Sequence, residues 1–177
     1  MTDQFFFDTD CLAAFLWVRE ESILERLYPG KIILPAQVYE EIKKVPHLQA
    51  RTDQMISNGV VQVASMMVDS DEYNDYVQMT SSENSLRIIG NGEAAGIAMV
   101  KHRGGTLASN NLRDIRIYVE KYQLNHITSG DIMIEALKAG LITEDEGNNI
   151  WAEMLRRRRW LPCATFSDYL KKHSPNK

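Results

Sequence analysis

Phe5-Phe6-Phe7-Asp8-Thr9 is a short apolar run that ends abruptly at an acid, and this stretch decides the fold. The three phenylalanines predict a short buried strand. Apolar residues then recur at helical spacing from Cys11 to Val18, which predicts a helix directly after the strand. A strand followed by a crossover helix is the start of a unit that pairs its strands in parallel.

The same alternation of strands and helices continues along the chain. Further strands are predicted at residues 32–34, 60–63, 106–109 and 126–128. One helix is predicted to begin at a capping box of Ser22 and Glu25, another at Pro35, and a third at a second capping box, Thr143 and Glu146. Further helices are predicted over residues 48–56, 94–100, 115–122 and 132–137. The pattern predicts an α/β fold, with a central, mainly parallel sheet flanked by helices.

The limits of the domain follow from the same pattern. One domain is predicted over residues 5–161, and a short C-terminal helical tail over residues 162–177, because Pro162 breaks the preceding helix. The segment from Asp69 to Asn84 is acidic and polar and is the least core-like part of the chain. A mobile region is predicted there.

Composition excludes several classes of protein. The 177 residues suit one domain, and 44% hydrophobic and 25% charged residues are typical of a globular protein. No apolar run approaches the roughly 18 residues that a membrane span needs. The two cysteines, Cys11 and Cys163, are too few for a disulfide framework or a thiolate zinc site. A cytoplasmic protein without a membrane partner is expected.

Charge is unevenly distributed along the chain. The net charge is -4, which by itself disfavours a nucleic-acid partner. However, residues 151–177 hold seven of the 20 basic residues and only two of the 24 acidic ones. The run Arg156–Arg159 is either a solvated helix end, where cations suit the dipole, or a patch that binds phosphate.

Polar residues follow two of the predicted strands, where parallel α/β sheets carry their functional sites. Asp8 ends the first strand, with Asp10 two residues further on. Asn110 and Asn111 follow the strand at 106–109. The predicted helices carry further acids that could join them: Glu41, Glu93, Asp114 and Asp131.

Such a set of oxygen ligands predicts a metal site. Carboxylates and amides without clustered Cys or His select hard cations such as Mg²⁺ or Mn²⁺, and two such ions can activate water against a phosphodiester. The structural alternative for Glu93, Asp114 and Asp131 is ordinary pairing with a helix dipole, and Asn111 with Asp114 could be an N-cap pair. Asp8 is harder to explain structurally, because an acid that ends a buried strand needs a partner or a metal.

Other kinds of site are not predicted. Residues 90–95, GNGEAA, fit the dinucleotide-binding pattern G-x-G-x-x-A. The preceding apolar run is very short, however, and Glu93 would place a carboxylate where a pyrophosphate should bind. The four histidines are scattered, so a zinc site is not expected.

Four blocks of the sequence, in order, resemble the PIN-domain family. Residues 6–9 look like its opening strand, residues 34–42 resemble its second block, with the acid on Glu41, and residues 92–98 resemble its third, with the acid on Glu93. Residues 107–111 stand at the fourth, and residues 126–142 are similar to the tail of predicted nucleic-acid-binding PIN proteins. The resemblance implies a Rossmann-like α/β/α fold and Mg²⁺- or Mn²⁺-dependent cleavage of RNA, as in VapC-like toxins.

The resemblance also implies a site. Its catalytic residues would be Asp8, Glu41, Glu93, Asn110 and Asp114, with Asp8, Glu93 and Asp114 as metal ligands. The chain departs from the family at the fourth acid, where it has Asn110 and Asn111, because an amide oxygen can ligate a metal but brings no charge. Asp114 or Asp131, one helical turn away, or Asp10 beside Asp8 are the candidates to compensate.

Two functional hypotheses follow. The first is a metal-dependent ribonuclease, which could act as the toxin of a toxin–antitoxin pair. The second is a catalytically degenerate PIN-like module that binds RNA or a protein through the helix from Thr143 and through Arg156–Arg159. RNA, an antitoxin-like protein and a second copy of the chain are the candidate partners.

Overall fold

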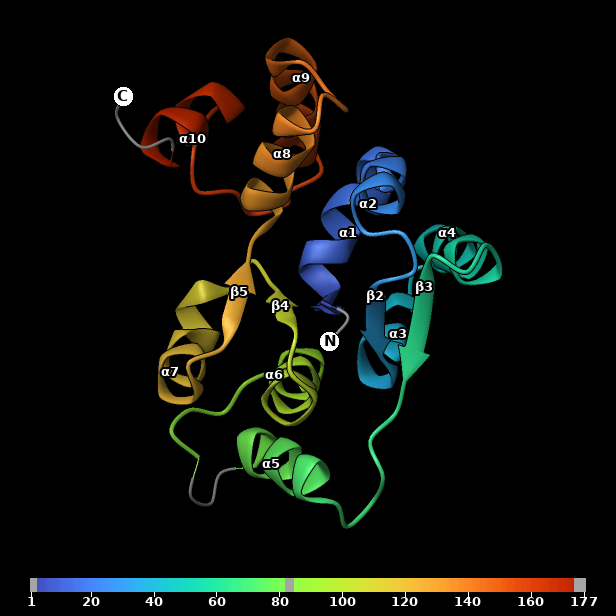
Figure 1. Cartoon of the computed structure of the whole chain (residues 1–177), viewed down its shortest axis with the longest axis vertical. Coiled ribbons are helices and arrows are strands. Elements are labelled where there is room, and N and C mark those ends of the chain that lie inside the picture. Colours follow the sequence, from blue (N-terminus) through green and yellow to red (C-terminus); the bar gives the residue numbers. More distant parts are fainter. Residues whose placement is uncertain (1–2, 82–84, 174–177) are drawn as a thin grey trace.

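Five parallel strands form a single sheet at the centre of the molecule (Figure 1). The structure is a computed structural model, and it describes residues 3–81 and 85–173. The strand order is β3-β2-β1-β4-β5, and every neighbouring pair is parallel. The strands are β1 (Phe5–Phe7), β2 (Ile32–Pro35), β3 (Val61–Ala64), β4 (Thr106–Ala108) and β5 (Asn125–Ile127). The predicted α/β fold with a parallel sheet is confirmed.

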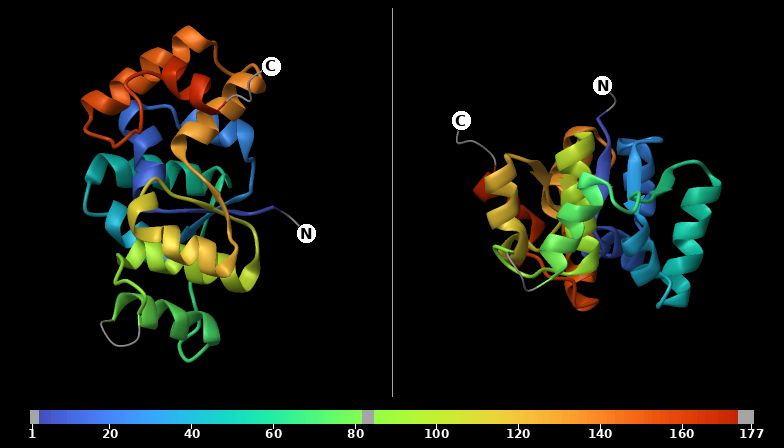
Figure 2. Two further views of the ribbon diagram at one scale, coloured as in Figure 1. Left: turned by 90° about the vertical axis from the view of Figure 1, so that its left-hand side faces the viewer. Right: turned by 90° about the horizontal axis from the view of Figure 1, so that it is seen from below.

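Helices cover both faces of this sheet (Figures 1 and 2). One hydrophobic core is built with α1 (Thr9–Val18), α2 (Glu21–Leu27), α3 (Ala36–Ile42), α4 (Pro46–Ser57), α8 (Ser129–Lys138), α9 (Glu144–Arg156) and α10 (Phe166–His173). A second core is built with α5 (Asp71–Thr80), α6 (Asn91–Arg103) and α7 (Leu112–Tyr122). The two cores meet the sheet from opposite sides.

The apolar run that opens the chain divides its side chains between the two cores. Phe7 packs into the first core and Phe6 into the second, and both are fully buried. Side chains of a strand alternate between the faces of a sheet, so a central strand covered on both faces must be apolar throughout. This explains why β1 shows no polar alternation, and it leaves Asp8 as the first polar residue at the carboxyl end of the sheet.

Two local predictions from the sequence are wrong. The segment predicted to be mobile contains α5, whose N-terminus is capped by Ser70 and which packs against α6. Its Met79 is buried and its Asp75 accepts hydrogen bonds from Lys101 and His102, both at 2.5 Å. Residues 82–84 of that segment lie outside the described residues.

The other error concerns the capping boxes. The helix α2 begins at Glu21 with Glu20 at its N-cap and no side-chain cap, so Ser22 lies inside the helix. The box at Thr143 is confirmed, since its hydroxyl accepts from the amide of Glu146 at 3.2 Å. A sequence spacing of three therefore marks a helix start only where the backbone of the first residue is extended.

The C-terminal helix α10 packs as part of the first core. Its Phe166 and Tyr169 are buried, and both rings lie against Trp151 of α9 at centroid distances of 5.8 and 5.2 Å. The indole of Trp151 also donates to the carbonyl of Cys163 at 2.9 Å. None of the helices in the described ranges has both the length and the apolar character needed to cross a membrane.

Candidate functional site

Three acids from separate parts of the sequence line one cavity at the carboxyl end of the sheet. Asp8 follows β1, Glu41 comes from α3 after β2, and Glu93 comes from the first turn of α6. The cavity has a volume of ≈ 200 Å³, and its remaining lining residues are Thr9, Asp10, Gly90 and Gly92. Among the described residues, none that lines this cavity is basic. The carboxylates of Asp8, Asp10, Glu41 and Glu93 therefore share one cavity.

Asp8 is buried at the junction of β1 and α1. Its side chain caps α1, with Oδ1 accepting from the amide of Cys11 at 2.7 Å. Its other oxygen, Oδ2, is buried and has no hydrogen-bond partner among the described residues. Burial above all raises the pKa of Asp8 to about 7; the Ser109 hydroxyl and the Cys11 amide oppose this rise, and the charges of Asp10 and Glu93 add to it. One carboxylate oxygen of Asp8 is therefore engaged in the helix cap, and the other has no hydrogen-bond partner among the described residues.

Glu41 is held against the cavity by α1 and α6. Thr9 Oγ1 donates to Glu41 Oε2, and the amide of Gly92 donates to Glu41 Oε1 at 3.3 Å. A Cβ on Gly92 would lie 3.0 Å from Val38, so glycine allows α6 to approach α3 this closely. The neighbouring Glu40 points outward and pairs with Lys43 at 2.6 Å. Adjacent residues of a helix point in different directions, so only Glu41 of these two glutamates lines the cavity.

Glu93 is fixed by its own helix and by an asparagine that sequence reasoning did not place among the site residues. Its Oε2 accepts from the amide of Gly90 at 3.1 Å in a capping box, and its Oε1 accepts from Asn111 Nδ2 at 2.5 Å. Asn111 Nδ2 also donates to Asp114 Oδ2 at 2.8 Å. The side chain of Asn111 therefore links two carboxylates instead of capping the backbone of α7. Its N-cap position at the end of β4 was the signal available in the sequence.

Asn110 points away from the three acids. Its Oδ1 accepts from the amide of Ser129 at 2.8 Å and its Nδ2 lies 2.9 Å from the hydroxyl of the same residue. Both atoms of the amide are thus used to attach the end of β4 to the start of α8. The structure gives Asn110 this connecting role, and it is Asn111 that contacts Glu93.

Two further acids are engaged outside the cavity. Asp114 Oδ1 pairs with Arg87 at 2.5 Å while its other oxygen accepts from Asn111. Asp131 forms a capping box with Thr128 and accepts from Tyr169 at 3.0 Å. Asp10, in contrast, lines the cavity and is largely exposed. A metal-binding role for Asp114 stays a prediction, since it requires that Asp114 release these partners.

The residues that line the cavity fit a hard divalent cation by the chemistry of their donors. Within residues 3–81 and 85–173, no three His, Cys, Asp or Glu side chains already form a group that could hold a metal. The partnerless Asp8 Oδ2 and the carboxylates of Glu41 and Glu93 nevertheless supply only oxygen ligands, as Mg²⁺ and Mn²⁺ prefer. Asp8, Glu41 and Glu93 are therefore the side chains that would hold such an ion.

Comparison with known protein families places the chain in one of them. A family model described as a PIN domain (DUF3368) matches residues 4–175. The matched range includes every strand and helix described above and all of the acids that line the cavity. No protein among curated sequences matches the chain.

Proposed function

The chain belongs to the PIN-domain family, whose members are generally nucleases, and from this premise we propose that it is a ribonuclease that depends on Mg²⁺ or Mn²⁺. The observation that carries the proposal is the cavity of ≈ 200 Å³ lined by Asp8, Asp10, Glu41 and Glu93. A phosphodiester carries negative charge and would be repelled by these carboxylates alone. A divalent cation among them inverts the local sign.

Each acid has a distinct task in this proposal. Asp8 offers its free Oδ2, while its Oδ1 keeps the start of α1 in place. Glu41 is oriented by Thr9 and by the amide of Gly92, and Glu93 by Asn111 and the amide of Gly90. A bound Mg²⁺ or Mn²⁺ would polarise the phosphoryl oxygen and lower the pKa of attacking water. The protein supplies fixed carboxylates, and among the described residues none of those lining the cavity is basic.

A second candidate function is favoured by one observation. Asn111 stands beside Glu93, where PIN nucleases tend to have a further acid, and it brings an N–H group to Glu93 instead of a charge. A weaker cation site is compatible with a module that has lost catalysis and binds RNA or a protein. An antitoxin-like partner accompanies the nuclease hypothesis, because an unrestrained ribonuclease endangers its host.

Two substitutions, Glu41→Gln and its control Glu40→Gln, test the proposed function as a matched pair. We expect wild-type protein to cleave single-stranded RNA in Mn²⁺ or Mg²⁺ and to lose all cleavage in EDTA. Glu41→Gln should lower the single-turnover rate at least tenfold, because it removes one charge from the cation site. Glu40→Gln should cleave at the wild-type rate, because Glu40 is exposed and pairs only with Lys43.

The measurement is the rate of cleavage of an end-labelled single-stranded RNA at saturating metal, with protein in excess. Cleavage that persists in EDTA would rule out the metal-dependent nuclease. The absence of any turnover, with RNA binding retained, would favour the binding module. Equal rates for the two glutamine variants would exclude Glu41 from the site.

A further inference from the structure

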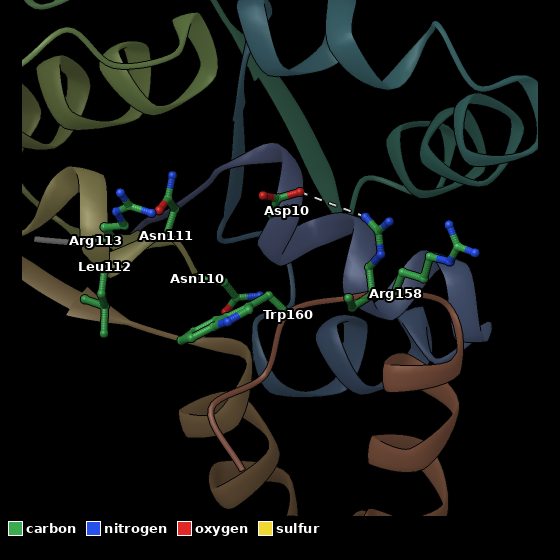
Figure 3. A pocket seen from close by; sticks show the side chains of 8 residues that line it. Asp10, Asn110, Asn111, Leu112, Arg113, Arg158 and Trp160 are labelled. Atoms are coloured by element: carbon green, nitrogen blue, oxygen red, sulfur yellow. Dashed lines mark ion pairs between the residues drawn. The ribbon is translucent and has the colours of Figure 1, made fainter. Parts of the chain in front are cut away.

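A second and larger hollow opens beside the acidic cavity (Figure 3). Its volume is ≈ 450 Å³, and Asp10 lines both hollows, so the two are adjacent. It lies between the start of α7, which contributes Leu112 and Arg113, and the segment after α9, which contributes Arg158, Arg159 and Trp160. The two hollows therefore share Asp10 as a common wall at the carboxyl end of the sheet.

The charge of the larger hollow is opposite to that of the cavity. Three arginines and a single acid, Asp10, line it. Neither Arg113 nor Arg158 has a partner for its guanidinium within the described part of the chain, and both residues are exposed. Arg159 lies 3.9 Å from Asp10 (dashed line in Figure 3). Within the described residues, neither of the other two arginines forms an ion pair with Asp10. Two guanidinium groups are thus available to bind an anion.

The basic run at the end of α9 is divided by its contacts. Arg156 and Arg157 pair with Glu153 of the same helix at 2.9 and 3.1 Å and face solvent. Arg158 and Arg159 instead line the hollow. The first pair behaves as a solvated helix end, and the second pair faces the space where a ligand would bind.

An exposed tryptophan accompanies these arginines. Trp160 is 65% exposed, whereas Trp151 of α9 is fully buried. Trp160 lines the same hollow as Asn110, Arg113 and Arg158, all of which are labelled in Figure 3. Aromatic side chains on a basic surface are the groups on which the bases of single-stranded nucleic acids stack. An aromatic surface between cationic groups matches a nucleobase flanked by phosphates.

The backbone at the end of α9 directs these side chains into the hollow. The amide of Arg159 donates to the carbonyl of Met154 at 3.0 Å and that of Arg158 to Leu155 at 2.9 Å, which is the pattern of a Schellman cap. Arg158 has φ 57°, in the left-handed region where glycine is the usual residue. An arginine there adopts a backbone conformation that its side chain disfavours.

We propose that this hollow binds the nucleotide next to the cleaved phosphodiester of a single-stranded RNA. The base stacks on Trp160, and its phosphates bind Arg158 and Arg113. A base within a duplex is already stacked on its neighbours, so the site selects unpaired strands. The placement beside a cleaved bond rests on the proposed function, whereas the binding of the strand does not.

Binding in EDTA separates this inference from catalysis. The probes are an oligouridine of about eight nucleotides and a fully abasic ribose-phosphate strand of the same length, which keeps the phosphates and lacks the bases. Wild-type protein should prefer the oligouridine about tenfold, and Trp160→Ala should lose this preference by weakening oligouridine binding alone. Trp160→Phe should retain most of it, because phenylalanine still offers a ring for stacking.

Two glycine variants test the arginine contact. Arg158→Gly should weaken binding of both strands and reduce the slope of log Kd against log salt by about 0.7, while leaving the melting temperature equal or higher. Arg19 ends α1 with φ 63° and lines neither hollow, so Arg19→Gly is the matched control. It should affect stability in the same direction and leave binding unchanged.

The outcomes distinguish the inference from the function on which it partly rests. Equal binding of the two strands by wild-type protein, or an equal loss of both in Trp160→Ala, would overturn stacking on Trp160. A hollow used only for a protein partner would show no RNA binding in EDTA, and this too would overturn the inference. Base-dependent binding without any cleavage would keep the nucleotide site and refute the nuclease. RNA cleavage without any effect of Trp160→Ala on RNA binding would keep the nuclease and refute the nucleotide site.

Discussion

Replacing Asp8 with asparagine is expected to abolish RNA cleavage and, at the same time, to stabilise the metal-free protein. The loss of cleavage should exceed 100-fold, because the variant removes a carboxylate that lines the acidic cavity and whose Oδ2 has no hydrogen-bond partner among the described residues. The gain in stability arises because a buried charge is removed. Asparagine keeps the cap on α1, since its Oδ1 can still accept from the amide of Cys11.

The size of the stabilisation follows from the pKa of Asp8. That pKa is about 7 in the folded protein, against an ordinary value of 3.8. A shift of roughly three units corresponds to about 4 kcal/mol at high pH. The two amide hydrogens of asparagine would each need a partner, which offsets about 1–3 kcal/mol. A net gain of about 2 kcal/mol at pH 8 corresponds to roughly 4–8 °C in Tm.

The raised pKa of Asp8 also determines whether the free energy of unfolding rises or falls with pH. A carboxyl group with a raised pKa holds its proton more tightly in the folded state, so its protonated form favours folding. The free energy of unfolding of wild-type protein should therefore decrease as pH rises from about 4 to about 7, and this component should be absent from Asp8→Asn. Thermal unfolding in EDTA across this range measures the difference between the two proteins.

Two controls make this result specific. Asp145→Asn changes an exposed acid in the first turn of α9 and should give the wild-type pH dependence and cleavage rate. Adding Mn²⁺ should raise the Tm of wild-type protein more than that of Asp8→Asn. A ligand that binds the folded state stabilises that state, and the variant lacks one carboxylate that would bind the ion. Parallel pH profiles for wild type and Asp8→Asn would show that Asp8 is not destabilising.

The fold was largely predictable because its signals are local. A strand buried on both faces must be apolar throughout, and Phe5–Phe7 followed by a helical pattern fulfils this requirement. The helix over Asp71–Thr80 could not be found in this way. Its surface is mostly polar and only Met79 is buried, and it contacts α6 through ion pairs that no local pattern reveals.

The site was only partly predictable. Asp8 and Glu93 could be found because each stands directly at the end or start of a predicted element. The choice between Asn110 and Asn111 depends on which amide turns toward α8 and which toward α6. Adjacent residues after a strand point in different directions, and the sequence does not say which partner each finds. The role proposed for Trp160 follows a left-handed residue, Arg158, at a position where glycine is the usual residue.

Replacing Asn111 with aspartate is expected to destabilise the metal-free protein and to strengthen cation binding. Asn111 donates to Glu93 Oε1 and to Asp114 Oδ2, at 2.5 and 2.8 Å. Aspartate would lose both hydrogen bonds and place a third carboxylate beside two others. We expect a loss of roughly 2–4 kcal/mol in EDTA at neutral pH, measured by denaturant unfolding. The loss should shrink as pH falls, because protonation relieves the repulsion.

The same variant should bind Mn²⁺ more tightly, because the new carboxylate supplies charge that asparagine lacks. An increase in affinity on the order of tenfold is expected by calorimetry. Asn125→Asp is the matched control, since it adds the same charge at the exposed start of β5 and should leave Mn²⁺ affinity unchanged. Unaltered affinity in Asn111→Asp would place this residue outside the cation site. Tighter binding together with faster cleavage would show that the asparagine moderates a nuclease, whereas tighter binding without cleavage would favour a module that has lost catalysis for another reason.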